Sequence, residues 1–235
     1  GQAAASRILE LARSLGEGDL LICLLSGGGS ALLNLPLPGL QLEEKREVTR
    51  ALLASGASIH EINTVRKHLS QIKGGRLAKA AFPARTLTLA ISDVPGDDPS
   101  TIASGPTVGD ATTRYDAEKI LNKYAIQTAG AVEAVLSSEL AESPAPDDPT
   151  LARSEFFITA TAAQALLTAA NRASAEGFDV TNLGDAVEGF AHELAAAHAR
   201  LFEEMIEKEG AQARTMLISG GEATVRITGS GRGGP

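Results

Sequence analysis

The feature that most constrains this chain is an apolar run that ends in three consecutive glycines. Residues 20–25 read Leu-Leu-Ile-Cys-Leu-Leu, and Ser26-Gly-Gly-Gly-Ser30 follows directly. A short uninterrupted apolar run is typical of a strand buried in a parallel sheet. Glycines after such a strand permit a tight turn and leave backbone N–H groups open to an anion. The segment therefore predicts an α/β protein with a phosphate or carboxylate site at the end of its first strand.

Length, composition and charge agree with a helix-rich α/β protein. The chain has 235 residues, of which 43% are hydrophobic and only 3% aromatic, which suffices for a sizeable core. A net charge of −8 argues against general binding of nucleic acid. The sequence contains no run of roughly 18 apolar residues, so no transmembrane helix is predicted. The one cysteine, Cys23, predicts an inert thiol in a reduced, cytoplasmic compartment.

Helical and strand-like patterns alternate along the chain, and this order predicts parallel βαβ units. We therefore predict a doubly wound, mostly parallel, Rossmann-like sheet with helices on both faces, followed by the start of a second α/β domain. The predicted helices cover 3–15, 41–54, 58–72, 76–81, 114–124, 128–138, 162–175 and 186–209. The predicted strands cover 20–25, 85–92, 155–160, 178–182, 215–219 and 222–228.

Three predicted strands end in loops rich in glycine and polar residues. Besides Ser26–Ser30, these are the loop from Ser92 through Asp93 to Thr107, and Ser219-Gly-Gly-Glu222. Ligands of open parallel sheets bind beyond the carboxyl ends of the strands, so the loops converge on one crevice if all three strands share a sheet. Asp93 suits a Mg²⁺ ligand or an acceptor of a hydroxyl proton. Its neighbours Asp97 and Asp98 suit turn capping equally well.

A basic segment accompanies these loops. Six lysines and arginines but only one acid, Glu61, lie in residues 60–85, counting Arg85. Asn63, Arg66 and Lys67 share one face of the predicted helix, and Lys73 follows it. Such cations can neutralise a carboxylate or a transferring phosphoryl group, and an ordinary solvated helix face is the alternative.

The glycine loop lacks both common nucleotide-binding patterns. No lysine follows it as in a Walker A motif, and Leu32 stands where the dinucleotide fingerprint requires a third glycine. The departure argues against hydride transfer with NAD(P). The four histidines have no spacing typical of metal ligands, and we interpret them as structural.

Several segments in order resemble the glycerate 2-kinase family that carries the MOFRL domain, whose members are often named hydroxypyruvate reductase. The matching segments run from residue 20 to residue 235. They are Leu24–Leu33, Ile62-Asn-Thr-Val-Arg-Lys-His-Leu-Ser70, Ile72-Lys-Gly-Gly-Arg-Leu-Ala78, Ser92-Asp-Val-Pro-Gly-Asp-Asp98, Ile102-Ala-Ser-Gly-Pro-Thr107, Ser219-Gly-Gly-Glu222 and Gly229-Ser-Gly-Arg-Gly-Gly234.

The resemblance implies phosphorylation of D-glycerate by ATP with Mg²⁺, with 2-phosphoglycerate as the favoured product, in a cleft between two α/β domains. It places residues 1–213 in a Rossmann-like domain and 214–235 at the start of a MOFRL-type domain. The catalytic candidates are Arg66, Lys67, Asp93 and Arg232, with Asp93 also the candidate Mg²⁺ ligand. The candidates for substrate and phosphate binding are Ser26, Gly27, Gly28, Gly29, Ser30, Asn63, Lys73, Ser104, Gly105, Thr107 and Glu222.

Family members extend further at both ends, and a Gly-Lys-Ala motif thought to supply an active-site lysine is absent here. We therefore expect residues 1–235 alone to turn over poorly or not at all. The expected partners are D-glycerate and a nucleotide, without nucleic acid or membrane; the sequence leaves a homodimer open. Two alternatives remain: an NAD(P)-dependent hydroxypyruvate reductase, and a non-catalytic module that binds a sugar acid or phosphate.

Overall fold

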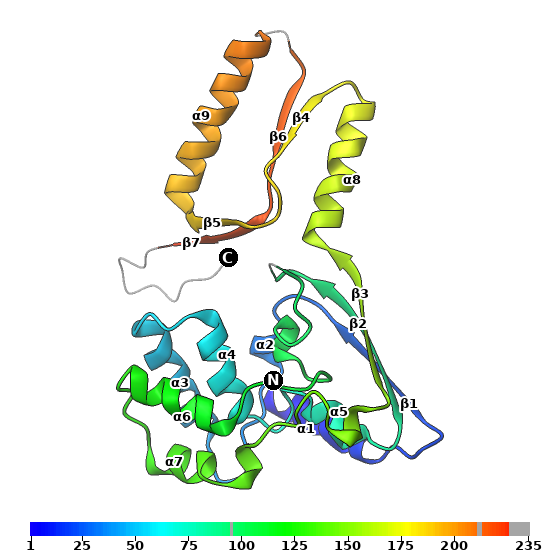
Figure 1. The fold of residues 1–235 in the computed structure, drawn as a ribbon, viewed down its shortest axis with the longest axis vertical. Coiled ribbons are helices and arrows are strands. Elements are labelled where there is room, and N and C mark those ends of the chain that lie inside the picture. Colours follow the sequence, from blue (N-terminus) through cyan, green and yellow to red (C-terminus); the bar gives the residue numbers. More distant parts are fainter. Residues whose placement is uncertain (95, 211–212, 226–235) are drawn as a thin grey trace. The chain divides into compact units, whose positions relative to one another are not determined.

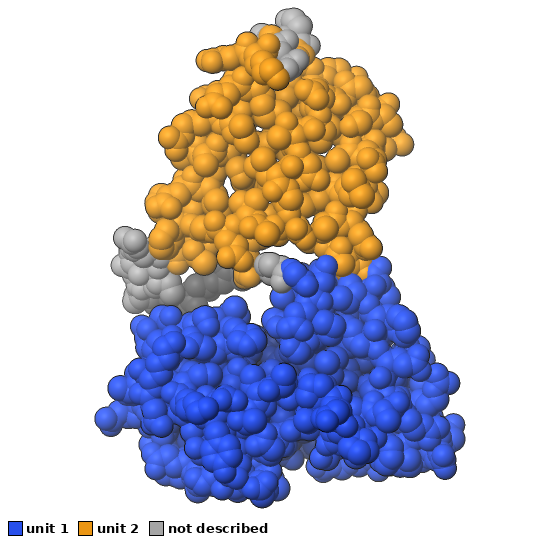
Figure 2. All heavy atoms as spheres, viewed as in Figure 1, with its two compact units in different colours: residues 1–159 blue, residues 160–235 orange. Residues whose placement is uncertain are grey.

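The computed structural model describes residues 1–94, 96–210 and 213–225 (Figure 1). The chain divides into two compact units, residues 1–159 and 160–235 (Figure 2). The boundary between these two units is not the domain boundary that the sequence predicts between residues 213 and 214. The predicted boundary concerns the domains of longer family members, and it stays a prediction.

Unit 1 contains a three-stranded sheet in the order β1 (Leu20–Leu25), β2 (Arg85–Ser92) and β3 (Ser154–Thr161), and the last two residues of β3 already belong to unit 2. β1 and β2 are parallel, with Leu25 opposite Ala90. The Thr86 N–H donates to the Arg153 carbonyl, and the Thr159 hydroxyl donates to the Ala90 carbonyl. Residue numbers thus rise together along β2 and β3, as in parallel strands. The predicted α/β class is confirmed.

One face of this sheet is covered by α1 (Gln2–Arg13) and α5 (Arg76–Ala81), and Figure 1 shows both helices beside the strands. The opposite face of β1 is open, since Leu20, Ile22 and Leu24 are 48%, 56% and 74% exposed. The sequence predicts helices on both faces of the sheet. Among the described residues, helices cover one face of β1 and leave its other face exposed. The covered side forms a core of Ala5, Leu9, Ala12, Leu35, Ile72, Leu77 and Ala81.

A second core in unit 1 is purely helical. It joins α3 (Leu42–Ala54), α4 (Ile59–His68), α6 (Arg114–Lys123) and α7 (Gly130–Leu136). A capping box starts α4, because the Ser58 side chain accepts from the Glu61 N–H and the Glu61 carboxylate accepts from the Ser58 N–H. The apolar side of α4 enters this core and leaves Asn63 and Arg66 on another side. The core comprises Leu37, Leu40, Val48, Leu52, Ile62, Val65, Leu69, Ala117, Leu121, Val132, Val135, Leu136 and Ala141.

The predicted helix at 58–72 is too long by about a turn. Instead of continuing the helix, its last residues bond to the segment before α3. The Leu37 N–H donates to the Leu69 carbonyl, and the Gln71 N–H donates to the Leu35 carbonyl. These tertiary hydrogen bonds replace the helical ones and turn the chain toward Lys73. Three short 3₁₀ turns (Ile102–Ser104, Glu139–Ala141 and Pro149–Leu151) and the single turn α2 (Gly29–Leu32) complete unit 1.

Unit 2 contains two small parallel pairs rather than one sheet. β4 (Asp179–Asn182) pairs with β6 (Thr215–Ile218), and β5 (Val187–Phe190) pairs with β7 (Gly221–Thr224). β6 therefore does not share a sheet with β1 and β2. The predicted convergence of the three loops required one common sheet, so that prediction is wrong for the loop that follows β6. Two helices, α8 (Ala162–Ala175) and α9 (Ala191–Glu209), accompany these strands.

The segment at 187–190 was expected to be the start of a helix and is strand β5 instead. Its partner β7 is distant in sequence, so no local periodicity reports the pairing. Gly189 has a φ of +148°, which a residue with a side chain rarely adopts and a helix does not contain. Among the described residues, no helix is long and apolar enough to span a membrane.

Candidate functional site

The ends of β1 and β2 bring the glycine loop and Asp93 together. A Cβ on Gly27 would collide with the Asp93 carboxylate, so that carboxylate packs against the Gly27 backbone. Gly28 has a φ of +76° and caps α2, a conformation that favours glycine. Among the described residues, no hydrogen bond uses the N–H groups of Gly27, Gly28 or Ser30. The loop therefore presents several amides to an incoming anion.

Ser30 is the meeting point of the predicted residues. Its hydroxyl lies 2.7 Å from the Ser104 hydroxyl, and its carbonyl accepts from Arg66 at 3.0 Å and from Lys73 at 2.8 Å. Arg66 also donates to Asn63 at 3.3 Å. Five predicted site residues are thus held together in a group that we call the Ser30 cluster: Ser30, Asn63, Arg66, Lys73 and Ser104.

The Ser30 cluster contains two basic side chains, Arg66 and Lys73, and is partly dehydrated. Lys73 is 1% exposed, and burial together with the neighbouring Arg66 guanidinium lowers the pKa of Lys73 to about 7. Burial also lowers the pKa of Arg66. With few carboxylates to balance them, these groups favour a ligand that brings negative charge.

The segment that carries Ser104 has an unusual backbone. Ala103, Ser104 and Gly105 have φ values of +51°, +62° and +55°, and left-handed conformers cost non-glycine residues about 1–2 kcal/mol each. The N–H groups of Gly74 and Gly75 donate to the Ser104 and Gly105 carbonyls. These bonds hold the strained segment against the N-terminus of α5, and such strain is common at functional sites.

Two predicted site residues have partners inside the protein. Lys67 forms a buried ion pair with Asp110 at 2.7 Å, with both side chains at most 6% exposed. A direct role for Lys67 as an anion ligand would require this pair to open. The hydroxyl of Thr107 lies 2.7 Å from that of Thr88, and both residues are buried, so Thr107 contributes to the core under β2.

Sequence reasoning missed Asp110, which organises the interior beside α4. It accepts from Lys67 and from the N–H and hydroxyl of Thr112. The neighbouring ring of His68 lies 2.8 Å from the Ala141 carbonyl and is fully buried, and burial lowers the pKa of His68. No local pattern distinguishes Asp110 from an ordinary loop acid. The structural interpretation of His68 agrees with these contacts.

The described residues contain no group of three or more His, Cys, Asp or Glu side chains able to hold a metal ion. Asp98 is occupied as a turn cap, since it accepts from the N–H and hydroxyl of Ser100 and from the hydroxyl of Thr101. Asp93 is exposed and has no hydrogen-bond partner in the described part of the chain. A single carboxylate with substrate phosphates is a usual Mg²⁺ environment, so Asp93 fits such an ion.

The remaining predictions lie elsewhere. Glu222 belongs to β7 of unit 2, and Arg232 lies outside the described residues.

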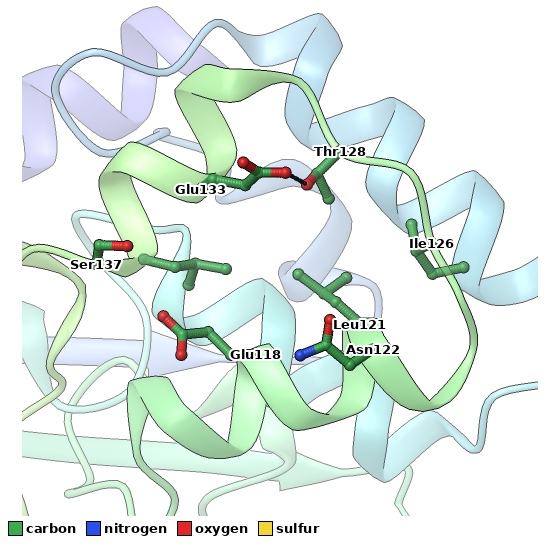
Figure 3. A pocket seen from close by; sticks show the side chains of 8 residues that line it. Glu118, Leu121, Asn122, Ile126, Thr128, Glu133 and Ser137 are labelled. Atoms are coloured by element: carbon green, nitrogen blue, oxygen red, sulfur yellow. Dashed lines mark hydrogen bonds between the residues drawn. The ribbon is translucent and has the colours of Figure 1, made fainter.

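A cavity of about 360 Å³ between α6 and α7 contains two carboxylates, Glu118 and Glu133 (Figure 3). Glu133 already accepts from Thr128 at 3.0 Å. None of the predicted site residues lines this cavity, so it is separate from the Ser30 cluster.

Comparison with known proteins adds a family context. Residues 1–137 match the family described as a domain of unknown function, DUF4147. A protein of Agrobacterium vitis with the provisional name hydroxypyruvate reductase is 46% identical over 98% of this chain. The D-glycerate 2-kinase of Thermotoga maritima is 42% identical over 97% of the chain. The glycerate kinase of Macaca fascicularis is 38% identical over 98% of the chain, which covers 68% of that relative.

The solved structure of the Thermotoga maritima glycerate kinase has the same fold, with a TM-score of 0.81 at 41% identity over 99% of this chain. The chain covers only part of these longer proteins. It spans 52% of the Agrobacterium protein, 53% of the Thermotoga kinase sequence and 55% of the Thermotoga structure.

Proposed function

The chain belongs to the glycerate kinase family, and from this premise we propose that it forms the substrate-binding part of an ATP-dependent D-glycerate kinase. The observation that carries the proposal is the Ser30 cluster, where Arg66 and Lys73 hold a glycine loop in which the amides of Gly27, Gly28 and Ser30 have no partner among the described residues. Glycerate and ATP are both anions, and phosphoryl transfer depends mainly on positioning and charge neutralisation.

Each part of this group has a role in the proposal. The N–H groups of Gly27, Gly28 and Ser30 bind an anionic oxygen of a substrate, and Arg66 adds positive charge beside them. Lys73 fixes the loop through its two contacts with Ser30. Asp93, packed against Gly27, orients the attacking hydroxyl or holds Mg²⁺. When bound, Mg²⁺ would offset the charge of the transferring phosphate.

The finer parts of the proposal concern the product and the longer protein. We infer 2-phosphoglycerate as the product, supported by the name of the Thermotoga relative. Residues 214–235 begin a MOFRL-type domain that contributes Arg232, supported by the Ser219–Glu222 and Gly229–Gly234 motifs. The proposed location is the cytoplasm, supported by the single cysteine.

The test is a phosphotransfer assay of the complete protein with ATP, Mg²⁺ and D-glycerate, followed by ³¹P NMR of the product. We expect 2-phosphoglycerate to accumulate. Asp93→Asn should lower kcat by about 100-fold or more, because a group that orients or deprotonates the nucleophile typically contributes that much. Asp147→Asn, at an exposed position, is the matched control and should behave as wild type.

Two outcomes would contradict the proposal. Oxidation of NADH with hydroxypyruvate, without consumption of ATP, would identify a reductase instead. Binding of D-glycerate without turnover of either cosubstrate would identify a binding module. Residues 1–235 alone, assayed beside the complete protein, should be weakly active or inactive.

A further inference from the structure

Lys45 of α3 is a buried lysine without a counterion among the described residues. It is 3% exposed, and its ammonium has no hydrogen-bond partner among the described residues. A buried charge is ordinarily paired with a carboxylate, because removing it from water without compensation is unfavourable. Lys45 is not among the site residues predicted from the sequence, and none of their roles accounts for its burial.

The charges that surround Lys45 are all positive. Burial, and then the neighbouring cations Lys73, Arg66 and Arg76, lower the pKa of Lys45 well below its ordinary value. On its own helix, the nearby Glu43 is bonded to Arg46 and Arg50. No carboxylate of the described residues pairs with the Lys45 ammonium.

Lys45 lines a cavity of about 280 Å³ beside the Ser30 cluster. Asn34 also lines it, and its side-chain oxygen is a second buried polar atom without a partner in the described part of the chain. Arg66 connects the cavity to the glycine loop through its bond to the Ser30 carbonyl. No acid contributes to the lining, which consists of Ala31, Asn34, Lys45, Arg46, Thr49, Arg50 and Arg66.

We propose that Lys45, Arg66 and Asn34 form an oxyanion subsite that binds the carboxylate or phosphate group of a small substrate. An oxyanion accepts from both the ammonium and the guanidinium, and it supplies the negative charge that the cavity lacks. An amide side chain such as Asn34 both donates and accepts, so it can bond a hydroxyl or an oxyanion of the same ligand. The connection with glycerate chemistry rests on the proposed function, whereas the binding of an oxyanion does not.

The test measures binding rather than turnover. The complete protein is titrated separately with D-glycerate and with inorganic phosphate by calorimetry, at constant ionic strength set with sodium chloride. We expect at least one of the two to bind, and Lys45→Met to weaken that binding about tenfold or more, as loss of a charged hydrogen bond does. Lys119→Gln, an exposed lysine with a 77% exposed side chain, is the control and should bind as wild type.

Proton uptake provides a second readout. An anion raises the pKa of Lys45, so binding in the wild type should take up protons over the pH range in which free Lys45 loses its proton, and titrations at several pH values locate that range. The heat of binding should therefore differ between Tris and HEPES buffers, and this difference should shrink in Lys45→Met. Lys45→Gln provides the same comparison if the methionine variant does not fold.

The outcomes separate this inference from the proposed function. Unchanged affinity and unchanged proton uptake in both Lys45 variants would overturn the subsite, as would failure of the wild type to bind either anion. If the protein phosphorylates glycerate but Lys45 does not affect binding, the proposed function stands and the subsite falls. If a Lys45-dependent anion binds but no phosphotransfer occurs, the subsite stands and the proposed function falls.

Discussion

At the scale of single residues, Lys73 both organises the glycine loop and makes the stability of the fold depend on pH. Lys73 donates to both the carbonyl and the hydroxyl of Ser30, yet it is nearly inaccessible to water. Its hydrogen bonds compensate only part of the lost hydration, and burial is the main reason for its lowered pKa. The lysine that holds the glycine loop therefore lies in a site where burial destabilises its protonated form.

The lowered pKa of Lys73 predicts that the free energy of unfolding depends on pH. The pKa of Lys73 is about 7 in the folded protein against an ordinary value of 10.5. Between these values the unfolded chain binds more protons than the folded one, so stability rises with pH, by up to about 1.4 kcal/mol per pH unit for one lysine. Urea unfolding across this window should show a smaller slope for Lys73→Met than for the wild type. Equal slopes would assign the pH dependence to other groups.

At the scale of elements, the N-terminus of α5 supports the strained segment that carries Ser104. Gly75 caps α5 with a φ of +78°, and its N–H donates to the Gly105 carbonyl at 2.7 Å. A Cβ there would lie 2.9 Å from a Pro144 carbon and 3.1 Å from the Val108 carbonyl oxygen. The backbone around the site therefore depends on the absence of a side chain at one position.

A matched pair of glycines tests this dependence. Gly56 has a similar φ of +76°, but a Cβ on Gly56 would meet no atom within 4 Å. Gly56→Ala should cost about 1–2 kcal/mol from its backbone conformation alone. Gly75→Ala should cost more, because it adds steric conflict with Pro144 and Val108, and it should weaken substrate binding as well. Chemical denaturation and substrate titration of the two variants provide the comparison; equal losses in both would show that contact around Gly75 is unimportant.

Elements were predictable from the sequence where their signals are local. β1, β2, α5 and α8 begin and end at the predicted residues, because apolar periodicity and flanking glycine or proline define them. β5 was missed because only its pairing with β7 makes it a strand. The Lys67–Asp110 pair and the cavity beside Lys45 were missed for the same reason: each joins residues from separate elements.

At the scale of the whole molecule, burial is unevenly distributed. Unit 1 contains both hydrophobic cores. Among the described residues of unit 2, Ala173 is the one buried residue. Local stability follows buried apolar contact, so the two units should differ in how readily they open.

Hydrogen exchange measured by mass spectrometry on residues 1–235 should show this difference. Amides of α4, in the helical core, should exchange much more slowly than those of α9, which has no buried residue among those described. The two helices in one sample serve as controls for each other. Equal protection of α4 and α9 would mean that the helices of unit 2 are stabilised by contacts other than burial.

The open side of the sheet makes protein concentration a variable in such measurements. Leu20, Ile22 and Leu24 add little to the folding free energy while water reaches them, since stabilisation scales with apolar area removed from water, at about 25 cal/mol per Å². A second molecule that covers them would gain this energy on association instead. We therefore expect residues 1–235 to self-associate as the protein concentration rises, whereas dilute samples give the properties of the single chain.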